Sequence, residues 1–183
     1  PKTSSAASDV YKRQLLHEIR LIKTKEEIKT IKEACEISSA AHIRAMKNVC
    51  PKMYEYQLEA EYVHEFMKKG ARNCAYPSIV GGGKNACILH YSDNKDLLMD
   101  GDLVLVDAGC EFNGYASDIT RTFPVNGKFS RAQQAVYEIV LDANVECIKT
   151  VKKGLTPNET EKKAIEVITC LLYTSPSPRD SDQ

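Results

Sequence analysis

The chain has 183 residues, of which 43% are hydrophobic and 27% charged, a composition typical of a soluble globular protein. Its 25 basic and 25 acidic side chains give a formal net charge of zero, which argues against a nucleic-acid-binding protein. No apolar run approaches the roughly 20 residues that a membrane span needs, so we expect no membrane partner and a cytoplasmic location, with mitochondria left open. The seven cysteines form no C-x-x-C pair, and we expect buried, reduced thiols rather than a disulfide framework.

Both ends of the chain resemble library sequence. Residues 4–14 (SSAASDVYKRQ) and 170–180 (CLLYTSPSPRD) back-translate to strings that look like the two opposite adapters of a transposase-type sequencing kit. We therefore expect residues 1–14 and 170–183 to be adapter-like and disordered, and residues 15–169 to be the native piece. The alternative is a natural disordered tail at each end.

Helix signals come first along the native piece. A capping box at Thr24–Glu27 predicts a helix that runs to about Val49, with apolar residues at spacings of three and four. A second helix is predicted over residues 55–69, where Gly70 follows as a terminating residue.

Strand signals follow, and two more helices come after them. We expect strands over residues 77–80, 87–91, 103–106 and 115–123, with a tight hairpin turn at Asn113–Gly114. The run Leu103–Val106 is continuously apolar, as in a strand buried on both faces. Capping boxes at Ser130–Gln133 and Thr156–Glu159 predict the last two helices. This order predicts an α+β fold in which helices flank an antiparallel sheet.

Two aspartates on the predicted hairpin carry the first chemical signal. Asp107 ends an apolar strand, where a carboxylate is costly unless it is paired, hydrogen-bonded or metal-bound. A two-residue turn at Asn113–Gly114 places Asp107 opposite Thr120, so Asp107 and Asp118 point to the same face. Their Cβ atoms then lie roughly 7 Å apart, close enough to bridge two divalent cations. From spacing alone, the alternative is that Asp118 pairs with Arg121 and that Asp107 caps a turn.

The histidines are ambiguous by themselves. His90 lies in the predicted strand 87–91, and an isolated strand histidine is structural more often than catalytic. His17, His42 and His64 fall in helical or leading segments, and we interpret them as non-functional.

Two stretches resemble a known family. YPSIVGGGKNACILHYSDN (76–94) and DGDLVLVDAGCEFNGYASDITRTFPVNGKFS (100–130) are similar to the catalytic domain of the Xaa-Pro aminopeptidases, or aminopeptidase P. The motifs LHY, VDAG and SDITRTFPVNGKF, in this order and spacing, carry the resemblance. It implies that residues 15–169 are a partial catalytic domain of peptidase family M24. Its pita-bread fold encloses a two-metal site between two similar halves, of which this is the first.

The resemblance also implies roles for individual residues. Asp107 and Asp118 would be metal ligands, with Asp118 contacting both ions, and His90 would be a catalytic residue that stabilises the tetrahedral intermediate. Tyr76 and Thr120 would contact the two carboxylates, not the ions, and so orient them. The implied cofactors are two divalent ions, Mn²⁺ first, with Zn²⁺ or Co²⁺ as alternatives. The implied remaining ligands, one histidine and two glutamates, belong to a second half that we expect to lie beyond this chain.

The implied activity is removal of the N-terminal residue from peptides with proline in second position, by metal-assisted hydrolysis. We expect the chain itself to bind metal weakly and to be inactive, and the parent protein to be a homo-oligomer. Two alternatives stay open: a prolidase, which cleaves Xaa-Pro dipeptides, and a non-catalytic pita-bread binding module.

Overall fold

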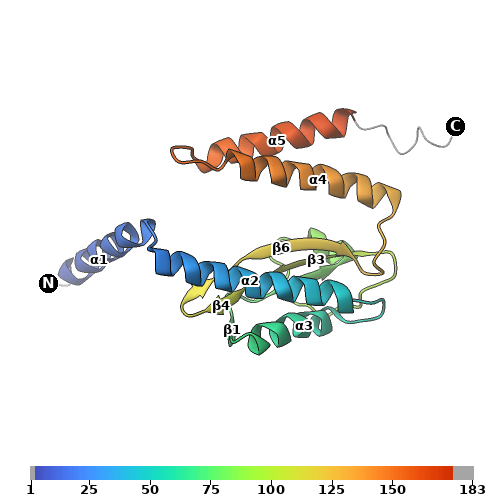
Figure 1. The fold of residues 1–183 in the computed structure, drawn as a ribbon, viewed down its shortest axis with the longest axis horizontal. Coiled ribbons are helices and arrows are strands. Elements are labelled where there is room, and N and C mark those ends of the chain that lie inside the picture. The colour runs from blue at the N-terminus through green and yellow to red at the C-terminus, as the bar shows by residue number, and fades with distance from the viewer. Residues whose placement is uncertain (1–2, 175–183) are drawn as a thin grey trace. The chain divides into compact units, whose positions relative to one another are not determined.

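The computed structural model describes residues 3–174 of the chain, which divides into two units at Gly127–Lys128. Figure 1 shows the elements of both units along the chain. The helices of the first unit are α1 (Thr3–Leu21), α2 (Lys25–Asn48), α3 (Glu55–Lys68) and the short 3₁₀ helix η1 (Gly83–Cys87). Its strands are β1 (Asn73–Cys74), β2 (Ile79–Gly82), β3 (Leu103–Ala108), β4 (Cys110–Phe112), β5 (Tyr115–Ala116) and β6 (Ile119–Pro124).

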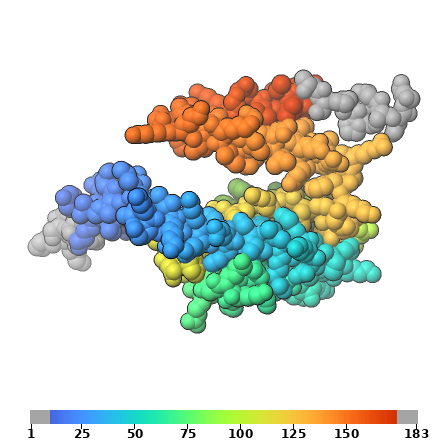
Figure 2. All heavy atoms as spheres, in the orientation of Figure 1, coloured from blue at the N-terminus to red at the C-terminus, as the bar shows by residue number. Residues whose placement is uncertain are grey.

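Helices α2 and α3 form where the capping and terminating signals predict them. Thr24 and Glu27 make the complete capping box at the start of α2, each side chain accepting the other's backbone N–H. Helix α3 ends at Lys68, and Gly70 follows with a φ of +92°. The two helices pack side by side, as the ribbon and the space-filling view agree (Figure 2).

The strands form two small antiparallel sheets, with the orders β2-β3-β6 and β1-β4-β5. The predicted hairpin is confirmed: β4 and β5 flank Asn113 and Gly114, whose φ values of +51° and +85° suit a two-residue turn. The predicted return strand 115–123 is interrupted instead at Ser117 and Asp118, which lie between β5 and β6.

The core of the first unit lies between the two helices and one face of the sheets. Val104, Val106 and Ala108 of β3 are buried in it, whereas Leu103, Leu105 and Asp107 are only half-buried. The prediction of burial on both faces is therefore wrong, because α2 and α3 cover only one face of β3 within this unit. Asp107 belongs to the other face.

The second unit is a helical hairpin. Helix α4 (Arg131–Thr150) begins at the complete capping box of Ser130 and Gln133, as predicted. Helix α5 (Pro157–Thr174) begins with Pro157, and the Glu159 carboxylate accepts the Thr156 backbone N–H at 2.9 Å. The two helices pack against each other.

Three expectations differ from the structure. Residues 3–14, expected to be disordered, belong to α1. Residues 170–174 continue α5, and residues 175–183 lie outside the described residues. None of the seven cysteines, all of which lie among the described residues, forms a disulfide, but only Cys110 is buried, so the expected burial is wrong for the other six. Within residues 3–174, no helix is both long enough and apolar enough to cross a membrane.

Candidate metal centre

The two aspartates meet on the half-buried face of the sheet. Strands β3 and β6 pair Asp107 with Thr120, as the two-residue turn predicts, and the register continues without a bulge into the β4–β5 hairpin. Asp118 lies just before β6. Because side chains alternate along a strand, the unbroken register brings the Asp107 and Asp118 carboxylates to the same side.

Tyr76 joins the two carboxylates through one hydroxyl group. Its O–H lies 2.6 Å from Asp107 Oδ1 and 3.1 Å from Asp118 Oδ1, and it is the donor to both. Partial burial, followed by the hydrogen bonds to Asp107 and Asp118, raises the pKa of Tyr76 well above its usual value. Tyr76 therefore keeps its proton at neutral pH and holds two like charges close together.

A cavity of about 400 Å³ opens over this group. Its lining residues are Tyr76, Pro77, Ile79, His90, Ser92, Asp107 and Asp118. The structure thus brings together four of the five predicted site residues on one cavity wall. It places the fifth, Thr120, directly across from Asp107 in the strand register.

His90 reaches the cavity from a turn, so the predicted strand 87–91 is wrong. Residues 83–87 form η1, and His90 lies in the exposed turn that follows, with a left-handed φ of +56°. A positive φ is uncommon outside glycine, and surrounding contacts must hold it. The apolar residues Ile88 and Leu89 of this segment point to solvent instead of pairing in a sheet.

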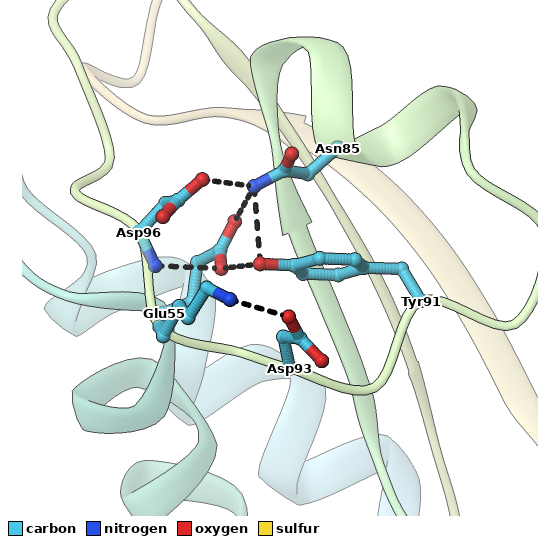
Figure 3. A network of polar contacts seen from close by, with 6 residues as sticks. Glu55, Asn85, Tyr91, Asp93 and Asp96 are labelled. Carbon is cyan, nitrogen blue, oxygen red and sulfur yellow. Dashed lines mark hydrogen bonds and ion pairs between the residues drawn. The ribbon is translucent and has the colours of Figure 1, made fainter.

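The first turn of α3 anchors the segment that carries His90 (Figure 3). Glu55 is fully buried, and its two oxygens accept four donors: Gly82 N at 2.8 Å, Asn85 Nδ2 at 3.0 Å, Tyr91 O–H at 2.7 Å and Asp96 N at 3.0 Å. Burial and the Glu55 hydrogen bond raise the pKa of Tyr91 to about 12, so its hydroxyl remains a donor. The network ties the segment down on both sides of His90.

A second anchor lies one helical turn further along α3. The Asn94 side chain accepts the Val80 N–H at 2.9 Å and donates to the Ser78 carbonyl at 2.8 Å. It also donates to the Glu59 carboxylate at 2.9 Å. Glu55 and Glu59 together fix the segment to the edge of β2.

The donor set fits part of a divalent metal site. Carboxylate oxygens suit hard and borderline cations, and two of them face one cavity here. Among residues 3–174, however, no group of three or more His, Cys, Asp or Glu side chains is arranged to hold a metal ion. The alternative pairing of Asp118 with Arg121 finds no support among the described residues, where Arg121 donates to the Thr120 carbonyl at 2.7 Å.

Sequence reasoning missed several residues that shape this region. Pro77, Ile79 and Ser92 line the cavity, and Glu55 anchors its wall. The first three lie in the stretch 76–94 that carries the family resemblance, but no role was predicted for any of the four. No sequence signal pointed to Glu55, because an acidic side chain in the first turn of a helix is common and does not indicate burial.

Comparison with known proteins identifies the class. Residues 29–175 match metallopeptidase family M24, and the chain belongs to this family. The likeness to individual members is close. The chain is 49% identical over 156 residues to the Xaa-Pro aminopeptidase of Escherichia coli strain K12, covering 85% of this chain and 35% of that protein. It therefore spans about a third of the length of that curated relative.

Solved structures agree with the fold. Proline aminopeptidase P II from Yersinia pestis is 54% identical with a TM-score of 0.85, covering 87% of this chain and 37% of that one. Zn-substituted E. coli aminopeptidase P in complex with product is 45% identical with a TM-score of 0.85, covering 91% and 39%. The predicted α+β fold, the first half of a pita-bread fold, is confirmed.

Proposed function

We propose that this chain supplies two carboxylate ligands to the hydrolytic centre of an Xaa-Pro aminopeptidase. The observation that carries the proposal is the convergence of Asp107 and Asp118 on the Tyr76 hydroxyl at the wall of one cavity. The identity to Xaa-Pro aminopeptidases supports the substrate class, a peptide with proline in second position.

Asp107 and Asp118 would hold two divalent cations, with Mn²⁺ first and Zn²⁺ or Co²⁺ as alternatives. When bound, the ions would supply Lewis-acid activation of water and of the scissile carbonyl. Tyr76 keeps both carboxylates oriented toward the cavity by its shared hydrogen bond. Thr120, across the strand from Asp107, would orient the carboxylates from the neighbouring position.

His90 would act on the substrate rather than on the ions. It is exposed on the cavity wall, and its turn is anchored on both sides through Glu55. A ring N–H placed there can donate to the oxygen of the attacked carbonyl as negative charge develops on it.

Metal binding to the chain tests the proposal directly. We expect Mn²⁺ titration to broaden the backbone amide NMR signals around Asp107 and Asp118 selectively. Asp107→Asn and Asp118→Asn should each weaken this effect at least tenfold, because each removes a charged ligand. Asp142→Asn, an exposed aspartate of α4, is the matched control and should leave the effect unchanged. Uniform broadening, or equal effects of all three variants, would refute the metal site.

Peptide cleavage supplies a second test. Because the described residues group only two candidate ligands, we expect this chain to leave the peptide Ala-Pro-Ala intact in the presence of Mn²⁺. Cleavage would refute the need for further ligands.

The remaining ligands are expected beyond this chain. In the parent transcript past Thr169, we expect codons for one histidine and two glutamates that complete the metal site, and their absence would favour the binding-module alternative. The cytoplasmic location and the homo-oligomeric parent stay predictions.

A further inference from the structure

Asp118 lies outside any strand and is exposed, yet the residues on both sides of it are held by polar contacts with α2, one buried and one partly buried. On its N-terminal side, Ser117 Oγ lies 2.7 Å from Ser38 Oγ. On its C-terminal side, the carbonyl oxygen of Ile119 lies 2.9 Å from His42 Nε2. Ser38 and His42 are four residues apart and therefore lie on the same face of the helix.

The hydrogen-bond directions at Ser117 are determined by its partners. The Ser117 hydroxyl donates to the Cys110 carbonyl at 3.1 Å, so its oxygen accepts a hydrogen bond from the Ser38 hydroxyl. The Ser38 oxygen in turn accepts the Cys110 N–H at 3.1 Å. Ser38 and Ser117 are both buried, so this small network has no access to competing water.

The protonation of His42 is determined in the same way. A carbonyl can only accept, so Nε2 carries the hydrogen that points to Ile119, and Nδ1 accepts the Tyr62 hydroxyl at 2.9 Å. The Tyr62 ring packs against the imidazole edge, with ring centroids 4.8 Å apart at 86°. His42 is thus held in one tautomer and one orientation by its contacts with Ile119 and Tyr62.

A third constraint acts from the opposite strand. A Cβ atom built on Gly109 would lie 1.8 Å from the Ser117 carbonyl oxygen, so only glycine allows this approach of the two backbones. The backbone before Asp118 therefore has contacts with α2 on one side and with the β3–β4 junction on the other.

We propose that Ser38 and His42 are positioning residues that clamp the backbone on both sides of Asp118 and so aim its carboxylate at the cavity. This inference rests on the proposed function, because it assigns Asp118 as a ligand. It also revises the interpretation of His42 as non-functional. A purely structural role for the two residues would stabilise the fold without affecting what Asp118 binds.

The test compares four variants of the 183-residue chain. His42→Leu removes the donor to Ile119, whereas His42→Gln keeps a side-chain N–H at a similar reach. Ser38→Ala breaks the other half of the clamp and leaves Cys110 N with the Ser117 oxygen as acceptor at 3.0 Å, so this variant should fold even if His42→Leu does not. Ala45→Gly, at a fully buried position of the same helix, is the control for general destabilisation.

Two readouts separate the possibilities: amide hydrogen exchange at residues 117–120 relative to β3, and the Mn²⁺-induced broadening around Asp118. We expect His42→Leu and Ser38→Ala to speed local exchange and weaken the Mn²⁺ effect by about fivefold or more, as the loss of one hydrogen bond implies. His42→Gln should restore most of both, and Ala45→Gly should change neither.

Exchange at residues 117–120 that matches the Ala45→Gly control would overturn the clamp, whether or not metal binds. Faster exchange with an unchanged Mn²⁺ effect would overturn the positioning role. A failure of the proposed function would look different, because the unsubstituted chain would then show no Mn²⁺ effect at Asp118 at all, and the clamp would have no ligand to position.

Discussion

Replacement of Glu55 by glutamine tests how the His90 segment is held. The side chain keeps its size, but one of its two oxygens becomes an NH₂ group. If that group faces the Oε2 partners, the Tyr91 hydroxyl can rotate and accept from it, whereas the Asp96 N–H, whose bond to Glu55 is partly buried, can only donate and loses its acceptor. The loss of that acceptor beside the fully buried Glu55 side chain costs about 1–3 kcal/mol, and the weakened bond to Tyr91 adds about 1 kcal/mol.

We therefore expect Glu55→Gln to lower the free energy of unfolding by about 2–4 kcal/mol, a large share of the roughly 5–15 kcal/mol typical of a domain. Urea unfolding followed by circular dichroism measures this change. The matched control is Glu59→Gln, one turn along α3, where the carboxylate accepts a hydrogen bond from the Asn94 amide and the remaining amide oxygen of glutamine can still accept it. The control should cost less than about 1 kcal/mol.

Equal losses for the two variants, or a loss below about 1 kcal/mol for Glu55→Gln, would refute the view that Glu55 anchors the segment. Hydrogen exchange adds a local check. Amides of residues 83–96 should exchange faster in Glu55→Gln than in Glu59→Gln when exchange in β3 is taken as the reference.

Three further predictions concern the same unit. Gly109→Ala should destabilise the fold by about 3 kcal/mol or more, because its Cβ would collide with the Ser117 carbonyl, and a Tm close to the unsubstituted value would contradict this. Burial lowers the pKa of His42, and the Arg121 charge acts in the same direction. As the pH drops, the imidazole is therefore protonated in the unfolded chain before it is protonated in the folded one, so the free energy of unfolding should fall below pH 6.5, by at most about 1.4 kcal/mol per pH unit. His42→Gln should remove that contribution in urea titrations at several pH values. Thr24→Ala should cost about 1 kcal/mol by loss of the helix cap, and an unchanged urea midpoint would show that the cap does not stabilise α2.

The register of the hairpin could be predicted because it depends on local chemistry. Asn113–Gly114 fixes the turn, and counting outward from it places Asp107 opposite Thr120. The same reasoning failed at residues 87–91, where an apolar run suggested a strand. That segment is held by polar contacts with Glu55, 30 and 36 residues away from Asn85 and Tyr91, and no local pattern reveals such partners.

The clamp on Asp118 was missed for a related reason. Ser38 and His42 lie 79 and 77 residues from their partners. The available signal was their place among the apolar positions of α2, beside Ala34, Ile37 and Ala41, since a polar side chain on a buried helix face requires a partner. The partial exposure of one face of β3 could not be predicted either, because an apolar run in the sequence does not show which elements cover each face of the strand.

The segment 83–96, which carries His90, contains two kinds of position. Asn85, Tyr91 and Asn94 are buried and hold the backbone, whereas residues 87–89 between them are exposed beside the cavity wall. Random substitution at 87–89 should therefore yield a library in which most members fold, while the exposed surface next to His90 varies. The surface beside His90 is therefore free to change in sequence at these three positions without a matching loss of stability.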